Sequence, residues 1–547
     1  MDSSTTILKA LKDLEPRAKL FFISPKISAI LICAVFLCGA YLLPRRDPYN
    51  LNKVPVLKRS RIWDAWASGQ WWRLFLPRLV PYLEVAYNEY SKKGKPFKIW
   101  VAALQDWVFV LPPKYVPKMR NCGPSELSMS DTVQKYLLPK FSGKFGKYEV
   151  EVASKLVNAN LSPIRLIIRA RTDEILEKEF GENLDKWKRL NARKLSSRIT
   201  KYVSGRIVYG PSLVANDTFL NAMEHYTSTF VSHGYLLRWF NLGPLRNYVL
   251  YLFQWSRRRN LAVVTRYIAD EIAKRKQAQQ TIGEDEKPID CIQWVLDENI
   301  PAHLKTPEEI AHRLMMVSVT FIDTMITSLL NLLYDTAACK EILDEIRAEI
   351  LEYPAAERWT ESNLAKMKKF DSFIRESFRL TPGLAPLTGW RLVMSEFFEF
   401  EKDFILPKGT LCVLPTMHIQ LDSADYPDPS KFDGLRFYKK DGDVKDGAKP
   451  DADPLNGWYA FGYGRQACPG RFYALMLLKM VLGEMLLRYD IRYAGGDRPR
   501  PGLSDIEPIV LADSTVELEF RSRVWLGAHR EGVDTASSSA VRNWEHR

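Results

Sequence analysis

The stretch that decides the fold covers residues 461–474 and reads Phe461-Gly-Tyr-Gly-Arg-Gln-Ala-Cys468-Pro-Gly-Arg-Phe-Tyr-Ala474. It is a glycine-punctuated loop that runs into an apolar helical pattern over residues 475–487. Gly462 and Gly464 permit a tight turn with positive φ, because glycine has no Cβ. Pro469 suits the first position of the following helix, where a missing amide hydrogen costs nothing. The pattern therefore predicts that Cys468 stands at the start of a helix.

Cys468 differs from the other cysteines in its predicted surroundings. The unpaired amides and the macrodipole at a helix start stabilise negative charge, which favours the thiolate form of this side chain. The other six cysteines are scattered, form no Cys-x-x-Cys pair and are interpreted as small buried hydrophobes. An odd total of seven argues against a disulfide framework or a structural zinc site, and it indicates a reducing compartment.

The loop resembles the ligand loop of the cytochrome P-450 family, whose pattern is Phe-x-x-Gly-x-x-x-Cys-x-Gly. Phe461, Gly464, Cys468 and Gly470 match this pattern in register and ahead of a predicted helix. The longer match Gly-Arg-x-Ala-Cys-Pro-Gly-Arg-Phe resembles the filamentous-fungal members that act in secondary metabolism. Those members often have histidine at the position of Gln466. The resemblance implies a haem-thiolate enzyme that carries haem b (iron protoporphyrin IX).

The resemblance assigns haem-binding roles to Cys468, Phe461, Gly464, Arg465, Arg391 and Lys155. Cys468 would ligate the iron, and Phe461 would shield its sulfur. Arg465, Arg391 and Lys155 would pair with haem propionates, although for Arg391 alone a surface salt bridge explains the residue equally well. A thiolate ligand donates electron density to iron and favours O–O cleavage, which monooxygenation requires.

Two upstream segments resemble the structural signatures of the family in the expected order. Residues 375–380 contain Glu376-x-x-Arg379, and positions i and i+3 of a helix share a face on which an ion pair can form. Such a pair alone is common on solvated helix faces. Residues 433–437 read Asp-Gly-Leu-Arg-Phe and supply Arg436. By the resemblance, Glu376, Arg379 and Arg436 form a structural cluster of charge-assisted hydrogen bonds.

The apolar pattern over residues 307–338 predicts one long, largely buried helix, which resembles the family helix that crosses over the haem. The match places Asp323 and Thr324 at the catalytic acid–alcohol pair, which can relay protons during oxygen activation. The alternative interpretation is a simple polar notch. The family has small residues just before the pair, whereas this chain has Thr320 and Phe321. Both would lie one turn before Thr324 on its face, so we expect Phe321 to crowd the oxygen groove or narrow the substrate cavity.

The expected walls of the substrate cavity are the long helix, a loop near residues 126–139, and residues 384–388. On the helix the wall includes Thr320 and Phe321. The last segment reads Leu384-Ala385-Pro386-Leu387-Thr388. These walls are largely apolar, which predicts a hydrophobic small molecule such as a terpenoid or a polyketide-like intermediate. Hydroxylation, epoxidation and desaturation all fit such a substrate.

The charge of the chain indicates a protein or membrane partner. There are 78 Lys and Arg residues against 65 Asp and Glu, a formal net charge of +13. Basic residues alternate with acidic ones, with no arginine-rich arm, so we expect no nucleic-acid partner. By the resemblance, electrons come from NADPH through a membrane-bound NADPH–cytochrome P-450 reductase with an acidic flavin domain. A b-type cytochrome is a second candidate electron donor.

The N-terminal region predicts a membrane anchor. Residues 27–43 are uncharged, and their number is at the lower limit for a spanning helix. A signal peptide is the alternative, but 26 residues precede the apolar run and no clean small-x-small cleavage site follows it. Basic residues flank both sides and give only a slight lean towards a cytosolic catalytic domain. We expect a single-pass protein of the endoplasmic reticulum membrane whose catalytic domain faces the cytosol.

One large catalytic domain is expected beyond the anchor. The predicted organisation is an N-terminal segment 1–26, the anchor 27–43, a linker 44–58, a catalytic domain 59–525 and a disordered tail 526–547. Helical periodicity dominates, with short strand-like runs at residues 99–111, 397–404 and 509–519. The expected fold is therefore mainly α with small β-sheets, the cytochrome P-450 fold. Besides a monooxygenase, a haem-thiolate isomerase or dehydratase without a reductase and a non-catalytic haem-binding protein are the alternatives.

Overall fold

A computed structural model describes residues 54–57, 78–101, 104–136, 150–181, 184–236, 249, 251–252, 254–278, 287–298, 301–381, 385–438, 458–506 and 509–523. The predicted N-terminal segment, anchor and tail lie outside the described residues, as does most of the linker. The described part begins at residues 54–57, where Val56 forms an isolated bridge to Lys98.

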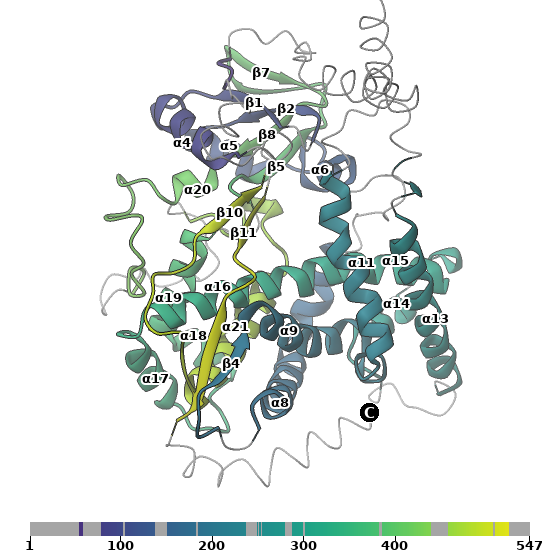
Figure 1. Cartoon of the computed structure of the whole chain (residues 1–547). Helices are drawn as coiled ribbons and strands as arrows, with labels where there is room; N and C mark the ends of the chain where they lie inside the picture. Colours follow the sequence, from purple (N-terminus) through teal and green to yellow (C-terminus); the bar gives the residue numbers. More distant parts are fainter. Residues whose placement is uncertain are drawn as a thin grey trace, which may run out of the picture.

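Helices make up most of the described domain (Figure 1). The longer ones are α8 (Leu161–Phe180), α9 (Ala192–Tyr209), α11 (Asp217–Leu236), α13 (Trp255–Ala278), α15 (Pro307–Ser318), α16 (Thr324–Ala338), α19 (Lys368–Leu380) and α21 (Arg471–Arg488). Shorter ones include α4 (Val80–Glu89), α5 (Val116–Asn121), α6 (Met129–Tyr136), α10 (Pro211–Val214), α14 (Cys291–Asp297), α17 (Leu343–Leu351), α18 (Glu361–Lys366) and α20 (Thr416–Ile419). The predicted fold class, mainly α with small sheets, is confirmed.

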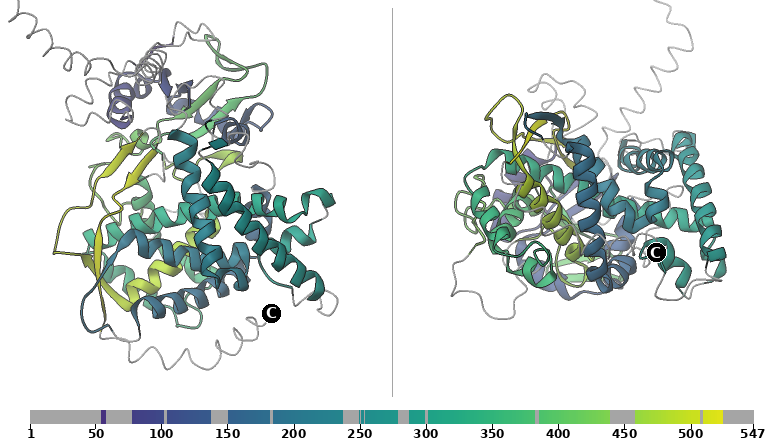
Figure 2. Two further views of the ribbon diagram at one scale, coloured as in Figure 1. Left: turned by 45° about the vertical axis from the view of Figure 1, so that its right-hand side comes forward. Right: turned by 90° about the horizontal axis from the view of Figure 1, so that it is seen from below.

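The strands form small sheets, and the largest of them lies at one end of the molecule, away from α8 and α13 (Figures 1 and 2). This five-stranded sheet has the order β1 (Phe97–Val101), β2 (Asp106–Val110), β8 (Leu411–Leu414), β5 (Thr388–Val393) and β3 (Leu127–Ser128). A three-stranded sheet has the order β4 (Lys188–Asn191), β12 (Glu517–Ser522) and β9 (Tyr489–Tyr493). Two hairpins join β6 (Phe397–Glu401) to β7 (Phe404–Pro407) and β10 (Leu503–Ile506) to β11 (Ile509–Ala512).

The predicted long helix is present but is not continuous α-helix. It starts at Pro307, where the Thr306 hydroxyl accepts a hydrogen bond from the Glu309 amide at 3.3 Å and acidic residues occupy the first turn. Between α15 and α16, residues Val319–Asp323 form a widened π-helical turn, η8. Such turns are frequent at functional sites. The widened turn lies directly before Thr324.

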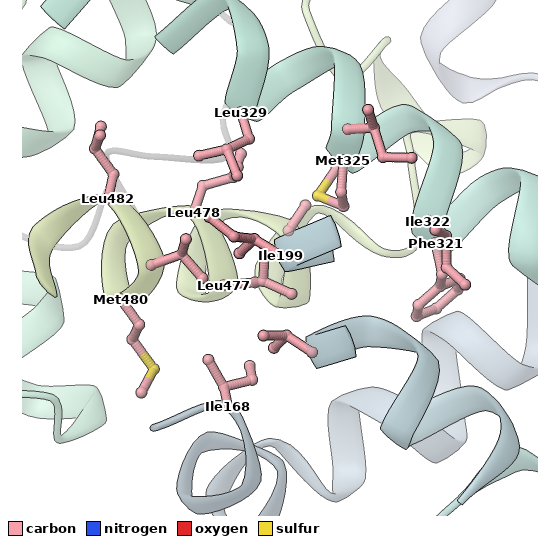
Figure 3. Packing of buried hydrophobic residues seen from close by; sticks show 14 of the residues in the cluster. Ile168, Ile199, Phe321, Ile322, Met325, Leu329, Leu477, Leu478, Met480 and Leu482 are labelled. Atoms are coloured by element: carbon pink, nitrogen blue, oxygen red, sulfur yellow. The ribbon is translucent and has the colours of Figure 1, made fainter. Parts of the chain in front are cut away.

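The long helix is a core helix. Within the described part of the chain, Pro307–Ala338 is the one helical run long and apolar enough to cross a bilayer, but it is mostly buried inside the domain. Figure 3 shows Leu329 of α16 beside Leu478 of α21, in a cluster that also contains Ile199 of α9 and Ile168 of α8. All four side chains are fully buried, and each such burial contributes roughly 1.5–3 kcal/mol.

Glu376 of α19 holds together the segments that lead to the cysteine loop. The Arg379 guanidinium donates to both carboxylate oxygens at 2.7 and 2.8 Å, and Arg436 Nε donates to the same carboxylate at 3.0 Å. The Asp433 amide adds a bond of 3.0 Å. Glu376 and Arg379 are completely buried, so each charge depends on the others for compensation.

The cluster reaches the cysteine loop through Gln420. Arg379 Nη1 donates to the Gln420 carbonyl at 2.7 Å, and the Gln420 side-chain amide donates back to the Arg379 carbonyl at 3.0 Å. The side-chain oxygen of Gln420 then accepts from the amide of Tyr459 at 2.8 Å, two residues before Phe461. The ion cluster therefore fixes the start of the loop.

Replacing Glu376 with Gln is expected to destabilise the domain by about 3–5 kcal/mol, because the buried guanidinium of Arg379 and the largely buried one of Arg436 lose their countercharge. The measurement is the free energy of unfolding by urea. The matched control is Glu345→Gln, since Glu345 is half-exposed and pairs with Lys369 at the surface, where such pairs contribute at most about 1 kcal/mol. Equal losses in the two variants would contradict the role given to the buried cluster.

Candidate active site

The cysteine loop requires glycine at two positions. Gly462 and Gly464 adopt φ values of 71° and 66°, which side chains disfavour. A Cβ on Gly464 would also stand 2.3 Å from the carbonyl oxygen of Arg120, so the loop could not pack on α5. The Cys468 amide donates to the Phe461 carbonyl at 2.8 Å and closes the loop. The ring of Phe461 itself packs against Phe378, with centroids 5.4 Å apart.

More residues separate Cys468 from the start of the following helix than the sequence predicted. Helix α21 begins at Arg471 with Gly470 as its N-cap, so Pro469 stands before the helix and not at its first position. The Gly470 amide and the Arg471 charge favour a thiolate, but burial outweighs them and raises the pKa of the Cys468 thiol above its ordinary value. The helix start therefore does not by itself give the thiolate that we expected. A metal cation would supply the missing charge, because a coordinating thiol is deprotonated outright.

Arg391 of β5 tests whether the residues present fit a haem. Its side chain is 1% exposed, with Nη1 donating to the Trp390 carbonyl at 2.8 Å and Nη2 reaching the Gln466 carbonyl at 3.5 Å. Its Nε is buried without a hydrogen-bond partner in the described part of the chain. A buried guanidinium with an unused donor beside the cysteine loop fits a carboxylate such as a propionate. The described residues contain no cluster of His, Cys, Asp and Glu that could hold a metal without a porphyrin.

Lys155 and Arg465 are placed differently from Arg391. Lys155 lies in a π-helical turn, η4 (Val152–Val157), where it is exposed and pairs with Glu151 at 3.0 Å. The contact with the loop is made instead by Asn158, the residue after this turn, whose Nδ2 donates to the Pro469 carbonyl at 3.4 Å. The structure therefore does not bring Lys155 to the cysteine loop. Arg465 is exposed and makes no hydrogen bond or ion pair with the described residues.

Gln466, the departure in the loop pattern, connects the loop to a neighbouring segment. Its Nε2 donates to the Leu127 carbonyl at 2.6 Å, and its Oε1 accepts from the Met129 amide at 2.9 Å. Leu127 and Met129 belong to β3 and α6, within the segment expected to wall the substrate cavity. Gln466 thereby ties the cysteine loop to that segment.

Thr320 of the widened turn η8 and Thr324, the first residue of α16, lie in different surroundings from the other residues of the turn. Thr324 Oγ1 donates to the Thr320 carbonyl at 2.5 Å, and Thr320 Oγ1 donates to the Val317 carbonyl at 2.8 Å. Thr320 is exposed and Thr324 half-buried, although both stand in the middle of a core helix. The two hydroxyl groups thus share one accessible face.

Phe321 lies in the core and not on the accessible face. Its side chain is 5% exposed, and its ring stands 5.1 Å from the ring of Tyr473 in the first turn of α21. The expectation that Phe321 narrows the oxygen groove or the substrate cavity therefore does not match its placement. The extra residue in the π-helical turn rotates Phe321 away from the face of Thr324.

Asp323 points towards α9 and α11. The hydroxyl of Thr227 donates to its Oδ1 at 3.4 Å, and Arg193, Lys201 and Glu224 are the charged groups that act on it. Burial raises the pKa of Asp323 to about 7, and the Thr227 hydrogen bond offsets this only in part. A carboxyl group that titrates near neutral pH can both hold and release a proton.

Only part of the segment expected to line the substrate cavity is accessible. Leu384 lies outside the described residues. Ala385 is half-buried, whereas Pro386 and Leu387 are buried, and Leu387 packs in the core under the five-stranded sheet. Thr388 is half-buried, and its hydroxyl shares a hydrogen bond with Thr416. Ala385 and Thr388 are therefore the members of this segment that could meet a substrate.

Sequence reasoning missed Arg471 and Asn158. Arg471 Nη1 donates to the Cys468 carbonyl at 2.9 Å, and its Nε is buried without a partner among the described residues. The position of Arg471 three residues after the cysteine was a usable signal. Asn158 gave no such signal, because its contact with the loop depends on the π-helical turn before it.

Comparison with known proteins identifies the family. The family profile described as Cytochrome P450 matches residues 153–520. The chain is 49% identical over 508 residues to the aspergilol synthase AuAP450 of Aspergillus ustus, covering 91% of this chain and 92% of the relative. It is 39% identical over 487 residues to the cytochrome P450 monooxygenase sttB of Aspergillus terreus, covering 87% and 91%. An ent-kaurene oxidase of Fusarium fujikuroi is 26% identical over 435 residues, covering 76% and 79%.

The chain belongs to the cytochrome P-450 family. The predicted resemblance to fungal members of secondary metabolism is confirmed. The chain is therefore a monooxygenase of the haem-thiolate class, and the family implies haem as its cofactor.

Replacing Asp323 with Asn should make stability less dependent on pH. Between about pH 4 and about pH 7 the folded wild type keeps a proton on Asp323 that the unfolded chain has lost, so its stability falls as pH rises. The variant stays neutral and should escape this fall, which amounts to at most about 4 kcal/mol. Urea unfolding across this pH range measures the difference. Asp270→Asn, which changes an exposed carboxylate of α13, should behave as the wild type; parallel curves for all three proteins would contradict the assignment.

Proposed function

We propose that this chain is a membrane-anchored monooxygenase that oxidises a hydrophobic small molecule with O2. Electrons come from NADPH through a membrane-bound reductase. The observation that carries the proposal is Arg391, a buried guanidinium with an unused donor beside the loop of Cys468. Cys468 would ligate the iron of haem b, and Arg391 would pair with a propionate. Arg465 would serve a second propionate from the exposed side of the loop. Lys155 would have to leave both its exposed position and its ion pair with Glu151 to reach a propionate, so it is the weakest of the proposed partners.

Haem bound by a thiolate supplies the activation of dioxygen. The residues of the chain handle the protons that this chemistry consumes. The hydroxyl of Thr324, on the accessible face of the long helix next to η8, can donate a proton. Asp323, whose pKa is raised to about 7, can then return a proton to this hydroxyl from the side of α11. Phe461 shields the sulfur from solvent together with the ring of Phe378.

The substrate is an apolar scaffold of the terpenoid or polyketide-like kind. The side chains that the expected cavity walls leave accessible, those of Thr320, Ala385 and Thr388, carry no charge. One relative is an ent-kaurene oxidase by name, and ent-kaurene is a terpenoid hydrocarbon. Hydroxylation, epoxidation and desaturation are all within the proposed reaction class.

The basic excess of the chain supports docking of an acidic flavin domain, with a b-type cytochrome as a second donor. We also propose the anchor at residues 27–43, ahead of a linker 44–58 and a catalytic domain 59–525 that faces the cytosol. Membrane lipid would then be a permanent contact of the chain. No nucleic-acid partner is proposed.

Cys468→Ala should abolish the signature of thiolate ligation. The wild type, reduced under carbon monoxide, should show the red-shifted Soret band that a thiolate opposite the gas produces, and the variant should lack it. Cys412→Ala is the control, because Cys412 is buried in the sheet region and should keep the band. A wild-type spectrum without the band would overturn the proposal. A product formed without NADPH consumption would favour an isomerase or dehydratase.

Arg391→Gln should weaken haem retention. Losing a buried charge-assisted hydrogen bond costs about 1.5–3 kcal/mol, which corresponds to a haem dissociation rate faster by about ten-fold or more. The rate is measured by transfer of haem to an excess of a haem-free globin. Arg391→Lys keeps the positive charge but loses the planar guanidinium group, so its haem dissociation rate should lie between those of the wild type and Arg391→Gln. If Arg391→Gln retains haem as long as the wild type, Arg391 is not a propionate partner.

The substrate class is tested separately in the native organism. Extracts of a strain that lacks the gene should accumulate a lipophilic intermediate that the purified enzyme, reductase and NADPH then convert. If the spectrum is correct but no such intermediate accumulates, the secondary-metabolite assignment fails while the monooxygenase chemistry stands.

A further inference from the structure

Phe321 stands at a position of the widened turn η8 where the family pattern has a small residue. Figure 3 shows its side chain on the long helix, one residue before Ile322 and apart from Leu329. Its ring is almost completely buried and contacts the ring of Tyr473, with centroids 5.1 Å apart and planes inclined by 35°. An aromatic contact of this kind is favourable beyond the apolar area that it buries.

Tyr473 is itself held in place. It is the third residue of α21, five residues after Cys468, and its hydroxyl donates to Ser204 Oγ of α9 at 2.9 Å. A second Tyr–Ser pair, Tyr209 with Ser318, joins α9 to the last residue of α15. Because α9 is bonded to both helices on either side of the contact, the Phe321 and Tyr473 rings have little freedom to separate.

The ring of Phe321 also reaches the cysteine loop. A Cβ built on Gly470 would lie 4.0 Å from Phe321 Cζ and 4.0 Å from the Cβ of Ala153. The tip of the ring and the methyl group of Ala153 therefore border the same space beside the backbone of Gly470, two residues after Cys468. Three elements converge there: η4, η8 and the loop that leads into α21.

We propose that Phe321 is a positioning residue that couples the turn of Asp323 and Thr324 to the loop of Cys468. This inference rests on the proposed haem-thiolate function. The ring fills the space between the two segments, so that the hydroxyl of Thr324 and the sulfur of Cys468 keep a fixed separation. Without the ring, the loop around Gly470 can shift, and water would gain access to the sulfur that would ligate the haem iron. The competing interpretation is that Phe321 shapes the substrate cavity.

The test compares Phe321→Ala with Ile322→Ala in the haem-loaded full chain. Ile322 is the next residue, is 1% exposed, and has no ring contact with Tyr473, so its variant reports the general cost of lost packing. The first readout is the half-life of the red-shifted Soret band of the reduced carbon monoxide complex. Phe321→Ala should shorten it by about ten-fold, whereas Ile322→Ala should stay within about two-fold of the wild type.

A second readout does not depend on haem spectra. Amide hydrogen exchange in peptides that cover residues 461–470 should rise in Phe321→Ala and stay near the wild-type level in Ile322→Ala. Phe321→Tyr keeps the ring and should restore both readouts. Equal behaviour of Phe321→Ala and Ile322→Ala would overturn the inference, as would a changed product pattern with an unchanged half-life. A wild type without the red-shifted band would instead overturn the proposed function.

Discussion

The buried carboxylate of Glu376 determines how α19, residues 433–437 and the cysteine loop are placed relative to one another. A fully buried negative charge is tolerated only where donors replace water, and here two guanidinium groups and a backbone amide do so. Arg379 lies on the same helix as Glu376, whereas Arg436 and the Asp433 amide belong to residues 433–437, so satisfying this one charge joins α19 to that segment. Through Arg379 and Gln420 the constraint extends to Tyr459, where the cysteine loop begins. The loop is therefore positioned by electrostatic compensation as much as by apolar packing.

The cysteine loop, the Glu376–Arg379 pair and the long helix could be predicted from the sequence because each depends on residues that are close together in the chain. The loop pattern, the Glu376–Arg379 spacing and the long apolar helix are short or periodic signals that survive without knowledge of the fold. The strand-like run at residues 99–111 likewise covers β2 and the end of β1, which are joined by a short connection. The position of Lys155 was not predictable in this way. Lys155 lies within a π-helical turn, where successive side chains do not follow the spacing of about 100° that an α-helix gives.

The same limit explains Phe321. Ordinary helical spacing places residues three and four before Thr324 on one face, and Thr320 does share that face. The π-helical turn turns Phe321 into the core, where it contacts Tyr473. The thiol of Cys468 shows a second limit. Helix-start electrostatics can be deduced from sequence, whereas the desolvation that outweighs them arises only when distant segments pack around the sulfur.

The widened turn separates two requirements that conflict on a regular helix. Oxygen chemistry needs hydroxyl groups and a titratable carboxyl group, and these are costly in an apolar core. Rigid placement needs close apolar packing on the same few residues. Because of the widened turn η8, the polar and the apolar side chains point in different directions. Thr320 and Thr324 face the accessible side and Asp323 faces α11, whereas Phe321 packs on α21. A larger residue than glycine is tolerated before the acid–alcohol pair because it serves the packing side of the turn and leaves the reactive side unobstructed.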